Sequence, residues 1–190
     1  MINKTFFKEF PVLETNRLIL RKFTLEDAKE VQSMRSDQRV MKHMDSKEHL
    51  SIAQSEEFIK ENLNTYSLEK GIFWAITEKN SGAFIGDFAF WRIDSKNFRA
   101  EIGYTLNPAY WGKGYMKEAM DAALAFGFKK LNLHSFEANI NPENMNSRKI
   151  LERTGFKKEA YFRENYYYDG RFLDSEIYCL LERDFTPRKA

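Results

Sequence analysis

The sequence has few of the residues that mark several specialised protein classes. It contains one cysteine, Cys179, so an internal disulfide cannot form. Nine glycines and four prolines in 190 residues are too few for a collagen-like or low-complexity chain. The three histidines, His43, His49 and His134, do not stand at metal-binding spacings. These scarcities exclude disulfide-rich and fibrous proteins, and we expect no bound metal.

Long apolar runs and a strong excess of one charge are also missing. The longest apolar stretches, Ile72–Ile76 and Ala83–Trp91, are too short or too interrupted to cross a bilayer. The first residues hold no apolar core of the secretory type. With 30 basic and 28 acidic residues, the net charge of +2 is far from that of a dedicated nucleic-acid binder. We therefore expect a cytoplasmic protein that binds neither membranes nor nucleic acid.

The composition is that of a globular protein that folds alone. Hydrophobic residues make up 43% of the chain and charged residues 31%. The length of 190 residues suits one ordinary domain, and no repeat or linker-like stretch divides it. We predict a single domain over residues 1–185 and a loose tail over 186–190.

The spacing of apolar residues in the first half predicts two helices and four strands. A strand over 18–23 precedes a helix capped by Thr24. The second helix spans 51–66, and its predicted apolar face comprises Ile52, Ile59, Leu63 and Tyr66. Strand-like runs over 72–78, 83–93 and 99–106 are separated by turn residues, which indicates an antiparallel meander.

The second half alternates helices with strands and ends in a hairpin. A helix is predicted over 115–130 and a strand over 135–140. A further helix is expected to start at Asn141–Pro142 and to stop at Gly155. Asp169–Gly170 predicts the turn of a hairpin within 157–182. This order predicts an α/β protein with an open mixed sheet, mostly antiparallel, flanked by helices, and it is not doubly wound.

A glycine loop joins a strand to a helix within residues 101–116. Gly112 and Gly114 let the backbone approach a ligand, the helix start contributes partial positive charge, and Lys113 adds a full one. The junction therefore suits a phosphate or diphosphate. Tyr115 after Gly114 excludes a Walker loop, and Lys117 in place of a third glycine excludes a dinucleotide fingerprint. A plain connecting turn is the alternative.

Short motifs stand in a fixed order along nearly the whole chain. They are Leu-Glu-Thr-Asn-Arg-Leu-Ile-Leu-Arg at 13–21, Asp-Ala at 27–28, Ile-Gly at 85–86, Glu-Ile-Gly-Tyr at 101–104, Trp-Gly-Lys-Gly-Tyr-Met at 111–116, Glu-Ala at 118–119, Asn-Met-Asn-Ser-Arg at 144–148, Leu-Glu at 151–152 and Gly-Phe at 155–156. This order resembles the GNAT acetyltransferases, and within them the ribosomal-protein alanine N-acetyltransferases of the RimJ and RimL type. The resemblance implies the GNAT-like open sheet with helices on both faces, and acetyl-CoA as cosubstrate.

The resemblance also implies a coenzyme-binding set. Trp111 and Met116 stand at the two ends of the family's acyl-CoA signature, where the general pattern has Gln or Arg and Gly or Ala. Backbone N–H groups of the loop would bind the diphosphate, and the strand ending at Leu106 would splay from 135–140 to expose backbone groups to the pantetheine arm. The predicted set is Tyr104, Leu106, Trp111, Gly112, Lys113, Gly114, Tyr115, Met116 and Asn144.

Glu101 is the predicted catalytic base. It lies on the face of its strand opposite to Ile102 and Tyr104. Burial in a covered strand raises the pKa of a carboxylate, which can then accept a proton from the amine. The branch that the chain resembles has Glu at this position. An ordinary ion pair on the sheet face is the alternative.

Ser147 is the predicted acid that protonates the leaving thiolate. It matches the position where the family places a hydroxyl near the sulfur, while Asn144 matches the amide that holds the pantetheine arm. Helix capping is the local alternative for both residues. Some members of the branch use a second Glu before the final turn. Tyr166 stands there, and Glu164 two residues earlier is expected on the same strand face, so either Tyr166 or Glu164 is the candidate substitute.

The predicted function is N-acetyl transfer from acetyl-CoA to a primary amine by direct attack in a ternary complex. Cys179 lies in an apolar run, which argues against a covalent thiol intermediate. A protein N-terminal α-amine is the predicted acceptor; a small amine, or a non-catalytic acyl-CoA sensor module, are the alternatives. The aromatic residues Trp74, Phe88, Phe90, Trp91 and Tyr166–Tyr168 fit a core better than an acceptor pocket. The sequence is compatible with a homodimer without requiring one.

Overall fold

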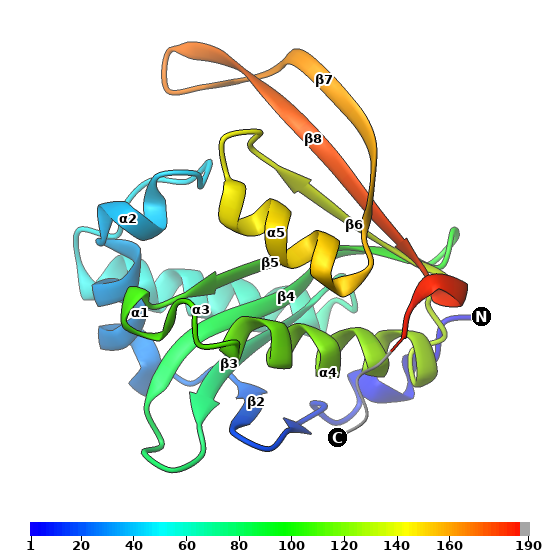
Figure 1. Ribbon diagram of the computed structural model, residues 1–190. Coiled ribbons are helices and arrows are strands. Elements are labelled where there is room, and N and C mark those ends of the chain that lie inside the picture. The colour runs from blue at the N-terminus through cyan, green and yellow to red at the C-terminus, as the bar shows by residue number, and fades with distance from the viewer. Residues whose placement is uncertain (187–190) are drawn as a thin grey trace.

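The computed structural model of the protein describes residues 1–186 (Figure 1). The strands are β1 Leu13–Glu14, β2 Leu18–Lys22, β3 Ile72–Glu78, β4 Phe84–Asp94, β5 Arg99–Leu106, β6 Ser135–Ile140, β7 Lys157–Tyr168 and β8 Arg171–Leu181. The α-helices are α1 Ala28–Arg35, α2 Gln38–Met41, α3 Ile52–Ser67, α4 Tyr115–Lys129 and α5 Met145–Thr154. Short 3₁₀ turns add Lys4–Phe7, Leu25–Asp27, Pro108–Tyr110 and Glu182–Asp184.

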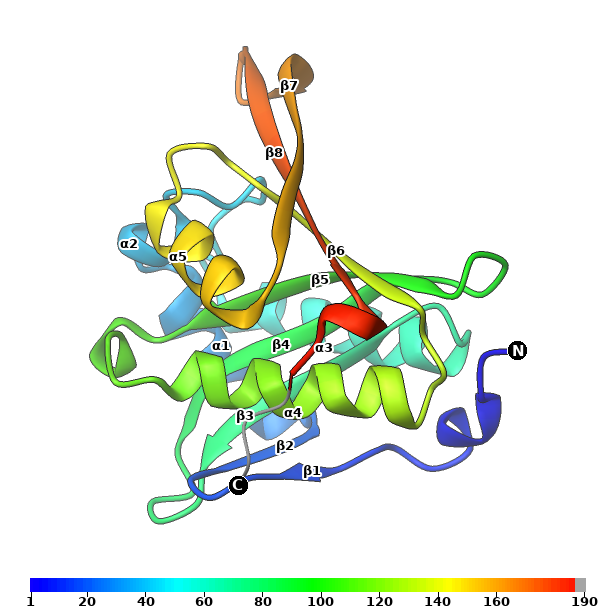
Figure 2. The same ribbon diagram turned by 45° about the vertical axis from the view of Figure 1, so that its right-hand side comes forward.

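One eight-stranded sheet, in the order β1-β2-β3-β4-β5-β6-β8-β7, runs through the described residues. Helices cover both of its faces: Figure 2 shows α4 in front of the sheet and α3 behind it. The face under α4 holds a large core that includes Trp74, Phe90 and Leu124, all fully buried. The other face holds a smaller core in which Val31 and Ile59 pack. The predicted mixed α/β sheet with helices on both faces is thus confirmed.

The strands β5 and β6 form the parallel pair of this otherwise antiparallel sheet, and they separate halfway along. Their pairing runs from Arg99↔Ser135 to Glu101↔Glu137 and then stops. The remainder of β5 stays paired with β4, while β6 stays paired with β8 up to Ile140. The predicted splay is therefore present, and it opens a gap between the two halves of the sheet that α4 and α5 border (Figure 1).

Two details differ from the sequence-based expectations, and one expectation falls partly outside the described residues. The helix α5 starts at Met145, because residues 141–144 form a turn in which the Asn144 N–H donates to the Asn141 carbonyl at 2.9 Å. Asn144 then caps the helix, and Pro142 lies outside it. Ile52 is 48% exposed and does not join Ile59 in the core, because it lies in the first turn of α3. Of the predicted tail, residues 187–190 lie outside the described residues.

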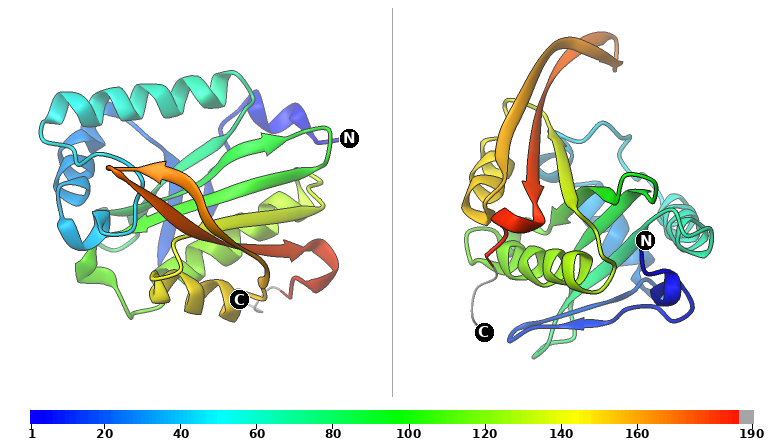
Figure 3. Two further views of the ribbon diagram at one scale, coloured as in Figure 1. Left: turned by 90° about the horizontal axis from the view of Figure 1, so that it is seen from above. Right: turned by 90° about the vertical axis from the view of Figure 1, so that its right-hand side faces the viewer.

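Other predicted boundaries agree with the structure. The strands over 72–78, 99–106 and 135–140 have the predicted ends. Thr24 forms a capping box with Asp27, and Gly155 ends α5 in the left-handed conformation at φ +100°. The hairpin turn at Asp169–Gly170 is present, and Figure 3 shows β7 and β8 projecting away from the helical layers. No helix within residues 1–186 is long and apolar enough to cross a membrane.

Candidate active site

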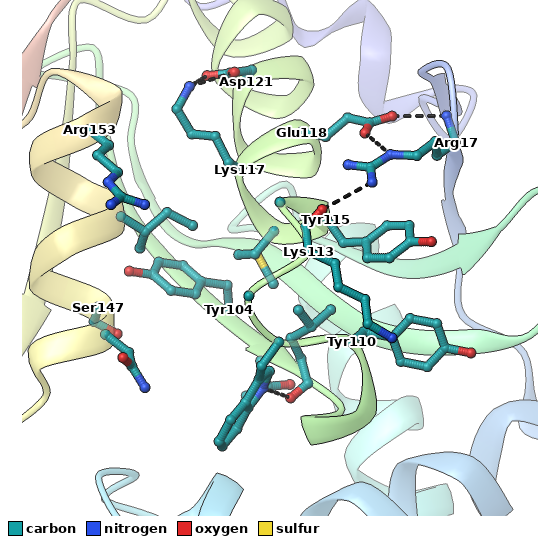
Figure 4. Close-up of a pocket in the computed structure, with 18 of the residues that line it drawn as sticks. Arg17, Tyr104, Tyr110, Lys113, Tyr115, Lys117, Glu118, Asp121, Ser147 and Arg153 are labelled. Carbon is teal, nitrogen blue, oxygen red and sulfur yellow. Dashed lines mark hydrogen bonds and ion pairs between the residues drawn. The ribbon is translucent and has the colours of Figure 1, made fainter.

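A cavity of about 1180 Å³ lies where β5 leaves β6, between the start of α4 and the face of α5 (Figure 4). Its volume exceeds that of most drug-sized ligand sites. Every residue of the predicted coenzyme-binding set lines it, and so does Ser147. Glu101 does not line it, because its side chain lies on the opposite face of β5 from Tyr104.

Side chains bind three carbonyl groups in the segment that leads from the end of β5 into the glycine loop. The Trp111 indole N–H donates to the Leu106 carbonyl at 2.6 Å, and Lys113 Nζ donates to the Ala109 carbonyl at 2.9 Å. The Lys113 carbonyl accepts from Arg17 Nη1 at 3.0 Å. One carbonyl of the glycine loop, that of Lys113, and two carbonyls that precede the loop are thereby held in fixed directions.

The N–H groups of the same loop have no such partners. Within residues 1–186, no turn or loop hydrogen bond uses the N–H of Gly112, Lys113 or Gly114 as donor. The first N–H groups of α4 also lack intrahelical acceptors, as at every helix start. Gly112 and Gly114 have φ angles of +73° and +79°, the left-handed values that turn successive N–H groups to one side. Free N–H groups together with a helix N-terminus form an anion-binding site.

The open edge of β5 offers further backbone groups. The Asn107 N–H donates to the Ile85 carbonyl at 2.8 Å, on the β4 side. Because neighbouring residues of a strand direct their backbone groups to opposite sides, those of Leu106 and Tyr104 face the gap left by β6. The carbonyl of Leu106 is already bound by Trp111, which leaves its N–H for a ligand.

Glu101 occupies the last position at which β5 and β6 pair. Its side chain is 13% exposed and lies 3.4 Å from Arg92 Nη1. Burial raises the pKa of Glu101; Arg92 opposes this and the like charge of Glu137 reinforces it. The carboxylate thus has the raised pKa expected of a base, and it also forms the ion pair of the alternative interpretation, so the structure is compatible with both.

Ser147 on α5 and Tyr104 on β5 lie on the same side of the cavity (Figure 4). Asn144, just before α5, lines the cavity as well. The Asn144 Oδ1 accepts from the Ser147 backbone N–H at 3.1 Å, so Asn144 caps α5, and the Ser147 hydroxyl takes no part in this cap. The Tyr104 ring stacks on Phe88 at 6.1 Å and places its hydroxyl beside Ser147. That hydroxyl is buried, and within residues 1–186 no group meets hydrogen-bond geometry with it. Burial raises the pKa of Tyr104.

The β7–β8 hairpin and the loop after α2 approach each other at Tyr166 and Asp45. Tyr166 lies half-buried against Asp45, and burial followed by the Asp45 charge raises the pKa of Tyr166 to about 12. Burial likewise raises the pKa of Asp45. Asp45 had no distinguishing motif in the sequence.

The inference that Glu164 shares a face with Tyr166 is wrong. The register between β7 and β8 shifts between Phe162 and Tyr166, and Glu164 has a left-handed φ of +48°. Its N–H donates to Asp174 Oδ1 at 2.8 Å, and its side chain is exposed. A strand bulge abolishes the two-residue alternation on which the inference rested.

Several other candidate residues have structural partners. Trp74, Phe88 and Phe90 are fully buried in the core, which confirms the core interpretation for these three aromatic residues. Arg148 Nη2 contacts the buried Glu176 carboxylate at 2.9 Å, which ties α5 to β8. Burial raises the pKa of Cys179 to about 12, so its thiol is a poor nucleophile at neutral pH. Within residues 1–186, no three His, Cys, Asp or Glu side chains gather as a metal site.

Two residues that contact the loop were not recognised as its partners from the sequence. Arg17 and Glu118 stand in motifs quoted above, yet they are 101 residues apart, and no spacing in the sequence shows that Arg17 contacts Glu118 or the loop. In the structure Arg17 Nε donates to Glu118 Oε2 at 2.6 Å, and its guanidinium lies 4.2 Å over the Tyr115 ring.

Comparisons with known proteins agree with this geometry. The sequence model of the Acetyltransferase (GNAT) domain family matches residues 17–157. An uncharacterized N-acetyltransferase p20 of Bacillus licheniformis is 38% identical over 92% of this chain and 98% of its own length. The [ribosomal protein uS5]-alanine N-acetyltransferase of Escherichia coli is 30% identical over 60% of each chain.

Solved structures show the same fold. A GNAT-family acetyltransferase from Bacillus anthracis superposes with a TM-score of 0.82 at 28% identity, covering 91% of this chain and 99% of its own. RimL, a ribosomal alpha-N-protein acetyltransferase solved in complex with coenzyme A, also gives a TM-score of 0.82, at 18% identity over 90% of this chain and 98% of its own.

Proposed function

The chain belongs to the GNAT acetyltransferase family, and we propose that it transfers the acetyl group of acetyl-CoA to a protein N-terminal α-amine. In this proposal residues 1–185 act as one domain. The amine attacks the thioester directly while both substrates are bound. Because the pKa of Cys179 is raised, its thiol stays protonated at neutral pH, which argues against an acetyl-cysteine intermediate.

The observation that carries the proposal is the asymmetry of the glycine loop. The Lys113 carbonyl is bound by Arg17, while the N–H groups from Gly112 to Gly114 have no turn or loop acceptor within the described chain. Side chains of the loop region also bind the carbonyls of Leu106 and Ala109, which precede the loop. Such a loop repels cations and binds anions such as a diphosphate. The adjoining cavity of about 1180 Å³ has room for the rest of a coenzyme-sized ligand.

The nitrogen gives up two protons, one when the ammonium becomes the attacking amine and one as the amide forms, while the sulfur takes up one, so one proton is released to solvent. A new C–N bond forms as the C–S bond breaks, and the thiolate leaves. Glu101 is positioned on the other face of β5 from the cavity, so it accepts the amine proton through water. Ser147 lines the cavity beside the buried Tyr104 hydroxyl and is our candidate to protonate the thiolate.

The acceptor is inferred from the relatives. The uS5-alanine N-acetyltransferase acts on a protein by its name, and it shares 30% identity with this chain over 60% of each sequence. We assign the rim where an extended N-terminal segment approaches to the contact between Asp45 and Tyr166, where the loop after α2 meets the β7–β8 hairpin. A carboxylate at this rim suits the positive charge of an amine before it loses its proton.

Release of free thiol from acetyl-CoA is the test. Peptides with free N-termini, the same peptides with blocked N-termini, polyamines and amino acids are offered in parallel, with Glu101→Gln as the matched variant. We expect turnover with free N-termini only, and at least about a hundredfold less with Glu101→Gln. Turnover with polyamines instead would identify a small-amine enzyme. Coenzyme binding by calorimetry without turnover on any acceptor would identify a sensor module.

A further inference from the structure

The turn between β1 and β2 is joined to the glycine loop through Arg17. The Arg17 backbone N–H donates to Glu118 Oε1 at 2.9 Å, and its Nε donates to Glu118 Oε2 at 2.6 Å. Its Nη1 donates to the Lys113 carbonyl at 3.0 Å. Figure 4 shows the guanidinium reaching the loop from the side of β2, with the Tyr115 ring beneath it.

We propose that Arg17 is a positioning residue for the coenzyme diphosphate: it holds the peptide between Lys113 and Gly114 so that the Gly114 N–H points into the cavity. This inference rests on the proposed function and adds a residue to it. In a trans peptide the C=O and the N–H point in opposite directions. No cis peptide bond is present within residues 1–186. A hydrogen bond that draws the Lys113 carbonyl toward Arg17 therefore directs the Gly114 N–H to the other side.

The loop needs such a restraint because of its composition. Gly112 and Gly114 carry no side chain, so the peptides they flank rotate with little steric resistance. A charge-assisted hydrogen bond from a guanidinium is strong enough to select one orientation. The guanidinium also packs closely on the loop, since a Cβ placed on Gly114 would lie 3.6 Å from Arg17 Nη2.

Glu118 holds Arg17 in place. Its carboxylate accepts from the Thr15 hydroxyl at 2.6 Å as well as from the Arg17 backbone and Nε. These bonds lower the pKa of Glu118 against the effect of burial, so it is ionised at neutral pH. Both residues line the cavity. Without Arg17 the Glu118 carboxylate would stand as an unpaired negative charge beside the diphosphate.

The alternative is that the ion pair between Arg17 and Glu118 only holds the turn before β2 against α4 and has no role in coenzyme binding. Rates measured with two acetyl donors distinguish these two roles. S-acetylpantetheine carries the same thioester as acetyl-CoA and lacks the diphosphate. A positioning role predicts that Arg17→Ala lowers kcat/KM for acetyl-CoA at least about tenfold, through KM, and leaves kcat/KM for S-acetylpantetheine within about twofold. A purely structural role predicts equal losses with both donors.

Two further variants complete the experiment. Arg17→Lys keeps the positive charge without the forked geometry of the guanidinium. We expect its KM for acetyl-CoA to lie between the wild-type value and the raised value of Arg17→Ala. Lys4→Ala removes the exposed ion pair between Lys4 and Glu69, neither of which lines the cavity. We expect it to leave kcat/KM unchanged for both acetyl donors. Equal losses with both donors for Arg17→Ala, or none with acetyl-CoA, would overturn the inference.

Calorimetry with coenzyme A distinguishes the failure of the two proposals. Wild-type protein that binds no coenzyme A overturns the proposed function together with the role of Arg17. Wild-type protein that binds coenzyme A, with Arg17→Ala binding it equally well, overturns the role of Arg17 alone. We expect the dissociation constant of Arg17→Ala to rise at least about tenfold.

Discussion

Glu101 and Glu137 are direct partners across β5 and β6, at the last position where these strands pair. Two carboxylates at such a position oppose each other's ionisation, and Glu137 reinforces the raised pKa of Glu101. Glu137 is also paired with Arg99. The strand junction therefore adjusts the candidate base as well as opening the site.

The first prediction concerns Glu137→Gln. Removal of the like charge, together with release of Arg99 toward Glu101, lowers the pKa of Glu101, since Arg92 and Arg99 already act in that direction. We expect the acid limb of the kcat/KM profile to move to lower pH, with the fold unchanged. A rate profile measured from pH 5 to 9 checks this, because general-base catalysis follows the pKa of its base. An unmoved acid limb would mean that Glu101 is not the titrating group.

Glu101→Gln should separate stability from activity. Because the pKa of Glu101 is raised in the folded protein, the folded state binds the Glu101 proton more tightly than the unfolded state does. The free energy of unfolding therefore falls as the pH rises from the pKa of Glu101 in the unfolded protein through its pKa in the folded protein. Above that window Glu101→Gln is expected to melt at or above the wild-type temperature while its turnover falls. Below it the two proteins should melt alike. Thermal melts at acidic and neutral pH test the sign.

Ser147 and Asn144 have separable roles in the structure. The cap of α5 uses the Ser147 backbone N–H and the Asn144 side chain. Ser147→Ala should therefore keep its stability and lose about a hundredfold in kcat if its hydroxyl delivers the proton. Asn144→Ala should lose about 1 kcal/mol of unfolding free energy as a cap. Chemical unfolding and steady-state rates on both variants check the assignment; a stability loss in Ser147→Ala would favour the structural role.

Gly114→Ala tests the loop geometry against a matched glycine. Gly114 has φ +79°, and Gly82 in the β3–β4 turn has φ +69° with no other atom within 4 Å of the position that a Cβ would take. Either alanine should cost about 1 kcal/mol of stability through backbone strain. Only Gly114→Ala should raise the KM for acetyl-CoA, because Gly82 does not line the cavity. Equal KM values in the two variants would contradict the role of the loop.

Tyr104→Phe removes a buried hydroxyl that has no hydrogen-bond partner within residues 1–186. An unpartnered buried polar group costs about 1 to 3 kcal/mol, so its removal should leave stability unchanged or increase it. If substrate or Ser147 uses the hydroxyl during turnover, kcat falls at the same time. Melting temperature and kcat measured together decide whether this phenol is idle.

The sequence allowed the sheet to be predicted closely where burial alone decides the structure. The strands at 72–78 and 99–106 are buried or half-buried along their length, and their ends were predicted to the residue. The start of α5 was not, because Pro142 fits both a first helical turn and the preceding loop. The choice depends on the bond between Asn144 and Asn141, which local composition does not reveal.

The sequence predicted the glycine loop of the candidate site, but it did not predict the side chains that hold this loop in place. The glycine spacing and the family motifs indicated residues 111–116, which do line the cavity. The contact between Arg17 and Lys113 joins residues 96 positions apart, and no periodicity encodes it. The bulge at Glu164 was missed for the related reason that it arises from cross-strand bonds to Asp174.

The bulge at Glu164 bears on whether β7 can pair with an edge strand of another copy of the protein. The strand β7 is an outer strand of the sheet, and Tyr161, Phe162 and Tyr167 are exposed along it. An uninterrupted ladder of this kind is a template on which further chains assemble. The shifted register and the left-handed Glu164 interrupt the regular backbone of β7 midway. The free edge of β7 therefore does not offer a continuous row of backbone groups with which another chain could pair. The irregularity that breaks the alternation of side chains is thus one of the features by which an edge strand resists edge-to-edge pairing.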